Sequence, residues 1–381
     1  MSHKTYIVYP YFAHYRLPIL KKIQADLEIQ PTFISGVETD ERLKIIDAET
    51  ARQNGLNWRL VKNHWLFGKR FLWQSDLIKV CLYEDYDFIV FLASPFFITT
   101  WIAMIIAKLR KRTVIQWGHF ILRHDLKRAL KRVFYGMPDG LWLYGSWAKG
   151  VLIKLGFKED RLVVINNSLD HEAQLTVRAG LDLQSCRRER AKYFRHPERP
   201  MLLFLGRLTR RKRIDLLIEA AAKLRDDGFM VNVLIIGDGE TGAMLKHLVS
   251  EKMMDEQVVF MNETYSENEI AMLFGMADLT VSPGDVGLLA MHSMVYGTPV
   301  ISHDNPYRQM PEFEAIIPGK TGQLYEYDSV DSMAGTIRAW LETQQGRRDE
   351  IRQDCQAVID QYYTPEYQLK MIKHSLRALA R

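Results

Sequence analysis

Two cations five residues apart, Arg207 and Lys212, occupy the segment FLGRLTRRKRID, just after a strand-like run. Gly206 provides a flexible turn at the end of that strand, and a helix-like pattern follows the cations. Two cations and a helix N-terminus directed at one point suit a diphosphate. We therefore interpret Gly206, Arg207 and Lys212 as a diphosphate-binding turn.

A solvated surface is the simpler explanation of a run of cations. It accounts well for Arg210, Arg211 and Arg213, which precede a predicted helix. It accounts badly for Arg207, because that residue directly follows a buried strand and a glycine. The sequence therefore separates one functional arginine from three surface arginines.

An acid and a histidine stand in the stretch VSPGDVGLLAMHSMVYGTPVIS, residues 281–302. Its pattern predicts the end of a strand, a turn, a short apolar helix and another strand. Asp285 either reaches a ligand or caps the helix. His292 either donates or accepts at a hydroxyl, donates to a phosphate, or packs against Tyr296.

The segment GDGETG, residues 237–242, matches the glycine pattern of dinucleotide-binding turns, with Glu263 at a suitable distance for a ribose contact. That fingerprint belongs to the first strand–helix turn of a domain, and here it follows the second strand. We therefore expect no NAD site.

Short β-branched runs alternate with longer helical patterns along almost the whole chain, which predicts parallel strands joined by helices. We expect two Rossmann-like doubly wound α/β domains facing a central cleft. The first covers residues 1–170, a polar connection covers 171–200, and the second domain covers 201–363. A C-terminal helix at about 364–381 is expected to cross back and pack on the first domain.

The composition, 47% hydrophobic and 25% charged with a net charge of +5, is typical of a globular protein. The cations are dispersed outside two short clusters, so nucleic acid is not an expected partner. Three widely spaced cysteines lack metal-ligand spacing, and the N-terminus lacks a signal-peptide pattern, so we expect a cytoplasmic protein.

The uncharged segment 88–107 is about long enough to span a bilayer. Ser94 and Pro95 interrupt it, and its first residues are strand-like. We therefore expect a strand, a turn and a helix that is apolar and buried all round.

The order of these motifs resembles that of the GT-B glycosyltransferases, specifically the retaining group often called family 4, or glycosyl transferases group 1. The resemblance is carried by GRLTRRK, GDGE, VVFMNE, YGTPVI and RLVVINNSLD, and it spans nearly the whole chain. It implies a donor diphosphate at Gly206, Arg207 and Lys212. It also implies a nucleobase near Asn262 and Glu263.

Most members of that family carry two glutamates at the positions of Gly284 and His292. By the resemblance, the first addresses the donor sugar and the second the nucleotide ribose. Asp285 is one residue away and could reach the sugar site, where we expect a catalytic role, while His292 would read the ribose. Gly287 and Leu288 match the family's backbone positions, whose amides reach phosphate oxygens.

In the first domain, His119 follows the strand VIQWG, where the family has a histidine near the donor sugar and acceptor. We carry that catalytic role to His119, although a lone histidine among aromatic residues is often a packed core residue. The first turn, YPYFAHYRLP, lacks the family's Gly-Gly pair. His14 and Arg16 there are expected on the acceptor side.

The helix ILRHDLKRALKRVF and the run at 110–112 form a basic, amphipathic cluster over residues 110–132. A solvated face explains such patterns, but a lipid-linked acceptor would favour docking on anionic lipid at the inner face of the membrane. The motif DYD at 85–87 resembles a metal-binding DxD of another transferase fold. It precedes a strand, so we expect neither a metal nor a cofactor.

The resemblance implies a metal-independent hexosyltransferase that moves a sugar from a nucleotide diphosphate sugar to a glycan or lipid-linked acceptor, with retention. Surface polysaccharide or oligosaccharide biosynthesis is the expected setting. Because both family glutamates are missing, a non-catalytic subunit with the same fold stays open as an alternative. A sugar-nucleotide epimerase is the other alternative, and it would need acids that residues 284–292 do not supply apart from Asp285.

Overall fold

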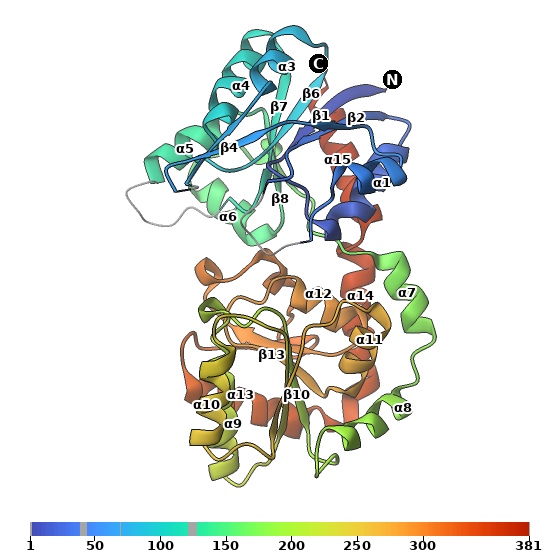
Figure 1. Cartoon of the computed structure of the whole chain (residues 1–381), viewed down its shortest axis with the longest axis vertical. Coiled ribbons are helices and arrows are strands. Elements are labelled where there is room, and N and C mark those ends of the chain that lie inside the picture. Colours follow the sequence, from blue (N-terminus) through green and yellow to red (C-terminus); the bar gives the residue numbers. More distant parts are fainter. Residues whose placement is uncertain (1, 39–43, 69, 121–127, 381) are drawn as a thin grey trace. The chain divides into compact units, whose positions relative to one another are not determined.

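The computed structural model describes residues 2–38, 44–68, 70–120 and 128–380, and it divides into two compact units. The N-terminal unit contains Met1–Asp170 together with Tyr363–Arg381, and the C-terminal unit contains His171–Tyr362. Each unit has a parallel sheet with helices on both faces (Figure 1). The predicted class, two doubly wound α/β domains, is confirmed.

The described part of the N-terminal unit has a seven-stranded parallel sheet in the order β3-β2-β1-β6-β7-β8-β9. Its strands are β1 (His3–Val8), β2 (Ile29–Ser35), β3 (Trp58–Leu60), β6 (Phe88–Leu92), β7 (Thr113–Gly118), β8 (Gly140–Leu143) and β9 (Leu162–Val164). Every residue of β7 is buried, as helices on both faces of a parallel sheet require.

The helices of this unit are the 3-10 helix η1 (His14–Arg16), α1 (Leu17–Ala25), α2 (Ala48–Gln53), α3 (Leu77–Tyr83), α4 (Ile98–Leu109), α5 (Arg128–Gly136), α6 (Ser146–Lys154), the 3-10 helix η2 (Glu159–Arg161) and α15 (Pro365–Leu379). The antiparallel hairpin of β4 (Asn63–Leu66) and β5 (Phe71–Gln74) has no counterpart in the predicted alternation.

The apolar segment 88–107 forms β6 and most of α4, as the sequence predicted. The expectation that the helix is buried all round is wrong, because Ile102, Ile105 and Leu109 are exposed on it. These side chains recur every three or four residues and therefore share one face. Among the described residues, no helix is both long and apolar enough to cross a membrane.

The last helix, α15, packs against α1 within the N-terminal unit. Lys373 bridges Asp26 and Glu28, at 2.8 Å from each carboxylate. The buried indole of Trp142 donates to Ser375 Oγ at 2.8 Å. The chain thus returns to its first unit at Tyr363, close to the start of the helix expected at about 364.

The C-terminal unit has a six-stranded parallel sheet among its described residues, in the order β12-β11-β10-β13-β14-β15. Its strands are β10 (Met201–Leu205), β11 (Asn232–Ile236), β12 (Val258–Met261), β13 (Leu279–Ser282), β14 (Val300–His303) and β15 (Gly322–Tyr325). Its helices are α7 (His171–Ala179), α8 (Leu183–Arg188), α9 (Ile214–Asp226), α10 (Gly242–Glu251), α11 (Glu267–Met276), α12 (Leu288–Val295), α13 (Val330–Thr343) and α14 (Arg348–Tyr362). Its 3-10 helices are η3 (Glu189–Lys192), η4 (Arg210–Lys212), η5 (Pro306–Arg308), η6 (Pro311–Ala315) and η7 (Gln345–Arg347).

Candidate functional site

Three polar loops follow the carboxyl ends of neighbouring strands in the C-terminal unit. Gly206 follows β10, Gly237 follows β11, and Gly284 comes two residues after β13. Because β11, β10 and β13 are adjacent and parallel, their loops meet at one edge of the sheet. This edge is where open α/β sheets bind ligands.

The GDGE loop is built against the Gly206 turn by direct backbone contact. A Cβ atom at Gly237 would lie 2.0 Å from the carbonyl oxygen of Gly206, and one at Gly239 would lie 2.3 Å from that of Leu208. The Leu208 amide donates to the Asp238 carbonyl at 2.9 Å. These two glycines are therefore explained by close packing of two loops, without a dinucleotide.

Lys212 joins the first loop to the third. Its carbonyl accepts from the Gly284 amide at 2.9 Å, and its Nζ donates to the Asp285 carbonyl at 2.6 Å. The Nζ also lies 3.4 Å from the Asp285 carboxylate. Burial lowers the pKa of Lys212, against the pull of Asp285. Lys212, predicted to bind the diphosphate, and Asp285, predicted to bind the sugar, thus form an ion pair with each other.

Asp285 is only 4% exposed, and Arg211 Nη2 lies 2.7 Å from its Oδ2. Arg211 is 65% exposed, as the interpretation of a solvated arginine predicted, but it also pairs with a buried acid. Arg213 is partly exposed and pairs with Asp215 and Asp328. Asp285 does not cap the following helix, because the N-cap residue is Gly287. Its contact with a donor sugar stays a prediction.

Arg207 is an exposed cation of this edge. Its side chain makes no hydrogen bond or ion pair with any residue that the structure describes, unlike the side chains of Arg211 and Lys212. A guanidinium without a protein partner keeps all five N–H donors for a ligand. The structure thus leaves Arg207 available for the role that its position predicted.

Gly284, which the resemblance aligned with a glutamate, has no room for a side chain. A Cβ atom at this residue would lie 2.1 Å from the Arg211 carbonyl oxygen and 2.8 Å from Lys212 Cα. Both contacts involve backbone atoms, which cannot turn away as a side chain can. The loop therefore excludes any side chain at 284 in this conformation.

Helix α12 begins directly after this loop. Gly287 has φ +52°, a conformation that favours glycine, and no described side chain caps the first turn, which begins at Leu288. The Gln309 side chain fixes the approach to the helix, since its Oε1 accepts from the Val286 amide at 3.0 Å. An uncapped N-terminus is suited to an anion, as expected for Gly287 and Leu288.

His292 on α12 belongs to a polar cluster with Gln174, Glu267 and Tyr296. Gln174 Nε2 lies 3.2 Å from Glu267 Oε1 and 3.3 Å from His292 Nδ1. The Tyr296 hydroxyl donates to the same carboxylate at 2.5 Å. Because the amide nitrogen is a donor, Nδ1 accepts and Nε2 carries the proton. Burial lowers the pKa of His292, against the pull of the Glu267 charge.

Three residues of this edge were missed in the sequence. Gln174 lies in a segment interpreted as a connection, and Glu267 stands in the first turn of α11, where acids are common at a helix N-terminus. Glu312 is 2% exposed, and its charge raises the pKa of Lys212. Only Glu312 left a signal, an acid between apolar residues in MPEF.

The predicted nucleobase residues lie at the edge strand of the sheet. Asn262 and Glu263 follow β12, and both are exposed. They are separated from the β10 loop by β11 in the strand order. Their role stays a prediction.

In the N-terminal unit, the predicted residues gather at the carboxyl ends of β1, β7 and β8. Arg16 is 7% exposed, lies over the rings of Tyr9, Trp117 and Tyr144, and donates to the Tyr144 hydroxyl. The His119 ring is 5.0 Å from the same Tyr144 ring.

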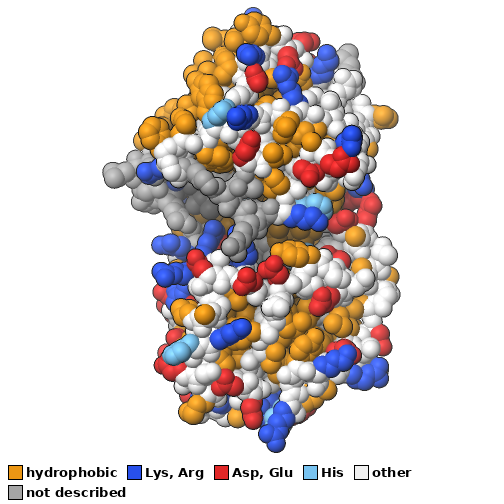
Figure 2. Space-filling model, in the orientation of Figure 1, with side chains coloured by type: hydrophobic (Ala, Val, Ile, Leu, Met, Phe, Trp, Pro, Cys, Tyr) orange, Lys and Arg blue, Asp and Glu red, His pale blue; other side chains and the backbone are white. Residues whose placement is uncertain are grey.

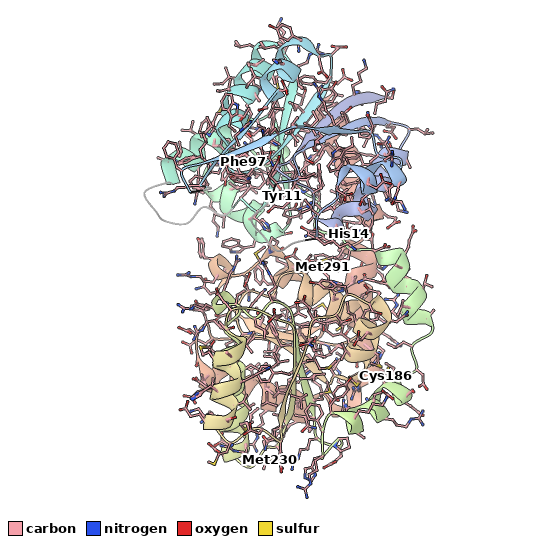
Figure 3. All side chains as sticks on the ribbon, in the orientation of Figure 1. Tyr11, His14, Phe97, Cys186, Met230 and Met291 are labelled. Carbon is pink, nitrogen blue, oxygen red and sulfur yellow. The ribbon has the colours of Figure 1, made fainter. Side chains whose placement is uncertain are left out.

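His14 follows β1 (Figure 3), and burial together with Lys44 lowers its pKa. The structure therefore brings Arg16 and His119 to one aromatic cluster. It places His119 and Asp285, the two predicted catalytic residues, in different units.

The acids of the DYD motif have structural partners. Asp85 pairs with Arg112 at 2.5 Å, and Asp87 accepts from the Lys4 amide at 2.9 Å. Among the residues that the structure describes, no group of three or more histidines, cysteines or acids has an arrangement that could hold a metal ion.

Residues 186–357 match the family model of glycosyl transferases group 1. The D-inositol 3-phosphate glycosyltransferase of Nocardia farcinica is 31% identical over 167 residues, which are 41% of this chain and 35% of that protein. Granule-bound starch synthase 1 of Pisum sativum is 27% identical over 168 residues, 38% of this chain and 25% of the synthase. The chain thus spans at most 35% of the length of these two relatives.

Solved structures match over the whole chain. HepE of Anabaena, crystallised with UDP, has a TM-score of 0.74 at 15% identity and covers 100% of both chains. A glycosyltransferase from Rickettsia africae has a TM-score of 0.75 at 15% identity and covers 99% of both chains. The family match thus lies within the C-terminal unit, and the chain as a whole has the GT-B fold.

Proposed function

We propose that this protein transfers a hexose from a nucleotide diphosphate sugar to a glycan or lipid-linked acceptor, with retention and without a bound metal. The observation that carries the proposal is the joined pair of loops in the C-terminal unit. There, Lys212 is hydrogen-bonded to the Gly284–Asp285 loop, Arg207 has no described partner, and α12 begins uncapped. HepE, which shares the fold, has been crystallised with UDP and with UDP-glucose.

The chemical requirement is stabilisation of the leaving diphosphate as negative charge develops on it. Arg207 has five N–H donors free, and Lys212 has three N–H donors, of which the Asp285 carbonyl accepts one. Fixed cations and a helix N-terminus can supply this stabilisation without a metal. His292, with its proton on Nε2, would donate to a ribose hydroxyl, where a glutamate would accept.

In this proposal, residues of the N-terminal unit bind the acceptor. Arg16 is a buried cation among aromatic rings with no carboxylate partner among the described residues, and His119 lies beside the same cluster. A guanidinium in that setting suits an anionic or hydroxyl-rich acceptor. His14 would line the same edge.

We further propose that the protein works at the cytoplasmic face of a membrane, in surface polysaccharide or oligosaccharide synthesis. Apolar side chains on α4 and α5 are exposed, including Ile105 at 50% and Val133 at 60%. Figure 2 shows hydrophobic side chains gathered over this part of the N-terminal unit. Exposed cations accompany them, Lys108 and Arg132 among them. Residues 121–127 of the predicted basic segment lie outside the described residues.

Replacing both Ile105 and Val133 by glutamate should weaken binding to vesicles with anionic lipid at least about tenfold. Each apolar side chain, once buried in the bilayer, contributes roughly 1.5–3 kcal/mol to binding. Co-sedimentation with phosphatidylglycerol-containing vesicles measures this. The matched control is Met244→Glu on α10, an exposed apolar residue of the other unit. Equal vesicle binding by the unchanged protein, the double variant and the Met244→Glu control would contradict the membrane proposal.

The catalytic proposal is tested by incubating the protein with UDP-, GDP- and ADP-sugars and measuring both thermal stabilisation and release of the nucleoside diphosphate. A ligand that binds only the folded protein must raise its stability. We expect stabilisation by one nucleotide class and release that depends on an added acceptor. Stabilisation without release for any acceptor would favour the non-catalytic subunit. Conversion of the free sugar nucleotide would favour the epimerase, and stabilisation by NAD alone would contradict all three.

A further inference from the structure

A cavity of about 390 Å³ opens in the C-terminal unit at the amino ends of β13 and β14. Asp278 and Pro299, which directly precede these strands, both line it. The loops described above follow the carboxyl ends of the same sheet, so the cavity lies at the opposite edge. Figure 3 marks the two ends of the unit with Met230, just before β11, and Met291, on α12.

Three arginines line this cavity: Arg187, Arg348 and Arg352. Arg187 is exposed, and its side chain makes no hydrogen bond or ion pair with any described residue. Arg352 donates from Nη1 to the Tyr296 carbonyl at 3.0 Å, while its buried Nε has no hydrogen-bond partner in the described part of the chain. The cavity is thus lined by guanidinium groups whose donors are only partly used.

Two acids, Asp278 and Asp349, line the cavity with the three arginines and raise the pKa of Arg187, but they offset only part of the positive charge. Asp278 accepts from Arg348 on one oxygen and from Arg190 on the other, so its carboxylate serves two arginines already. Asp349 also lines the cavity, but no ion pair within the described residues joins it to an arginine. The pKa of Arg187 is lowered first by burial and then by the charge of Arg348. The arginines therefore repel one another, and an anion between them would relieve that repulsion.

The start of α14 adds to the positive potential. Arg348, Ile351 and Arg352 belong to the first five residues of this 15-residue helix, and all three line the cavity. The N-terminus of a helix of this length carries a partial positive charge. Two arginine side chains and a helix N-terminus at one cavity form a site for a phosphate group.

The remaining wall is apolar. Trp340, Leu341 and Pro299 line the cavity beside the arginines. The volume falls within the range of about 300–1,000 Å³ that is usual for small-molecule sites, and it exceeds what one phosphate fills. A ligand with an anionic group and a small organic body would use both walls.

We infer that this cavity binds a phosphate group, carried by a phosphomonoester or present as inorganic phosphate. The inference does not depend on the proposed transfer reaction, because the cavity shares no residue with the loops that would hold the donor. It also predicts that phosphate binding survives loss of the donor-binding arginine.

The test is calorimetric titration of the Arg207→Ala protein, in which the proposed donor site is disabled, with inorganic phosphate and with glucose 6-phosphate. We expect one saturable site. If the ligand contacts the apolar wall, glucose 6-phosphate should bind more tightly than inorganic phosphate. Arg187→Gln in this background should weaken binding about tenfold, the effect of losing one charge-assisted hydrogen bond. Arg187 has no protein partner, so its replacement leaves the fold intact.

Arg188→Gln is the matched control, because Arg188 is the next residue and its side chain is 74% exposed. Its affinity should be unchanged. A second variant, Gln344→Glu, places a negative charge on the cavity wall and should weaken binding at least tenfold as well.

Tighter binding of inorganic phosphate than of glucose 6-phosphate would identify the free ion as the ligand. No saturable binding in the Arg207→Ala protein, or equal affinities in the Arg187→Gln and Arg188→Gln proteins, would overturn the inference.

Discussion

Replacing Arg207 by alanine is expected to lower kcat/KM for sugar transfer by about 10²- to 10³-fold, the usual cost of removing one preorganised donor from a developing charge. The physical reason is that Arg207 has no described protein partner, so its donors are available to the leaving diphosphate. The stability of the free protein should hardly change, since no described contact is lost. Steady-state kinetics on the sugar nucleotide found in the panel, with thermal unfolding of both proteins, measures the two effects.

Arg210→Ala provides the control for this experiment. Arg210 lies three residues further on and is exposed, and its described hydrogen bonds involve its backbone alone, with Glu240 and Arg213. Its replacement removes the same charge from the same loop, so a general electrostatic effect would appear in both variants. If Arg207→Ala and Arg210→Ala had the same small effect, the diphosphate would not bind where we propose.

Replacing Gly284 by alanine should lower the free energy of unfolding by about 2–4 kcal/mol, although the change adds one methyl group. The new Cβ atom would lie 2.1 Å from the Arg211 carbonyl oxygen, so the two loops would have to separate. Separation would also break the hydrogen bond between the Gly284 amide and the Lys212 carbonyl. Urea unfolding of the purified proteins measures the loss.

Gly335→Ala is the matched control for packing at glycine. Gly335 lies inside α13, and a Cβ atom there would meet no atom within 4 Å. Alanine in a helix interior is favoured over glycine by about 0.5–1 kcal/mol, so this variant should be slightly more stable.

The variant Gly284→Glu would restore the residue typical of the family and should be at least as unstable as Gly284→Ala. A stable and more active Gly284→Glu protein would contradict the structure of this loop.

The sequence by itself determined the architecture of the protein. Alternation of β-branched runs with helical patterns predicted two parallel sheets, because each strand and each helix must bury its apolar face locally. It also predicted that the glycine motif at 237–242 is no dinucleotide site, since position in the domain is a property of chain order. The structure explains Gly237 and Gly239 through contacts with Gly206 and Leu208.

Only the tertiary structure decided which polar side chains meet. The ion pair of Lys212 with Asp285 joins residues 73 positions apart, and Gln174 reaches His292 across 118 positions. Sequence spacing carries no information on such pairs, because they depend on how loops from different strands pack. For the same reason, the ion pair of Arg211 with Asp285 was not predicted, and Glu267 and Glu312 were missed.

Exposure was the other property that chain order did not determine. The apolar helix α4 presents Ile105 to solvent, although a uniformly apolar pattern predicts burial on all sides. Conversely, Arg16 is buried, because aromatic rings at the carboxyl ends of β1, β7 and β8 enclose its guanidinium. Local pattern sets which elements form, while burial follows from what packs against each of them.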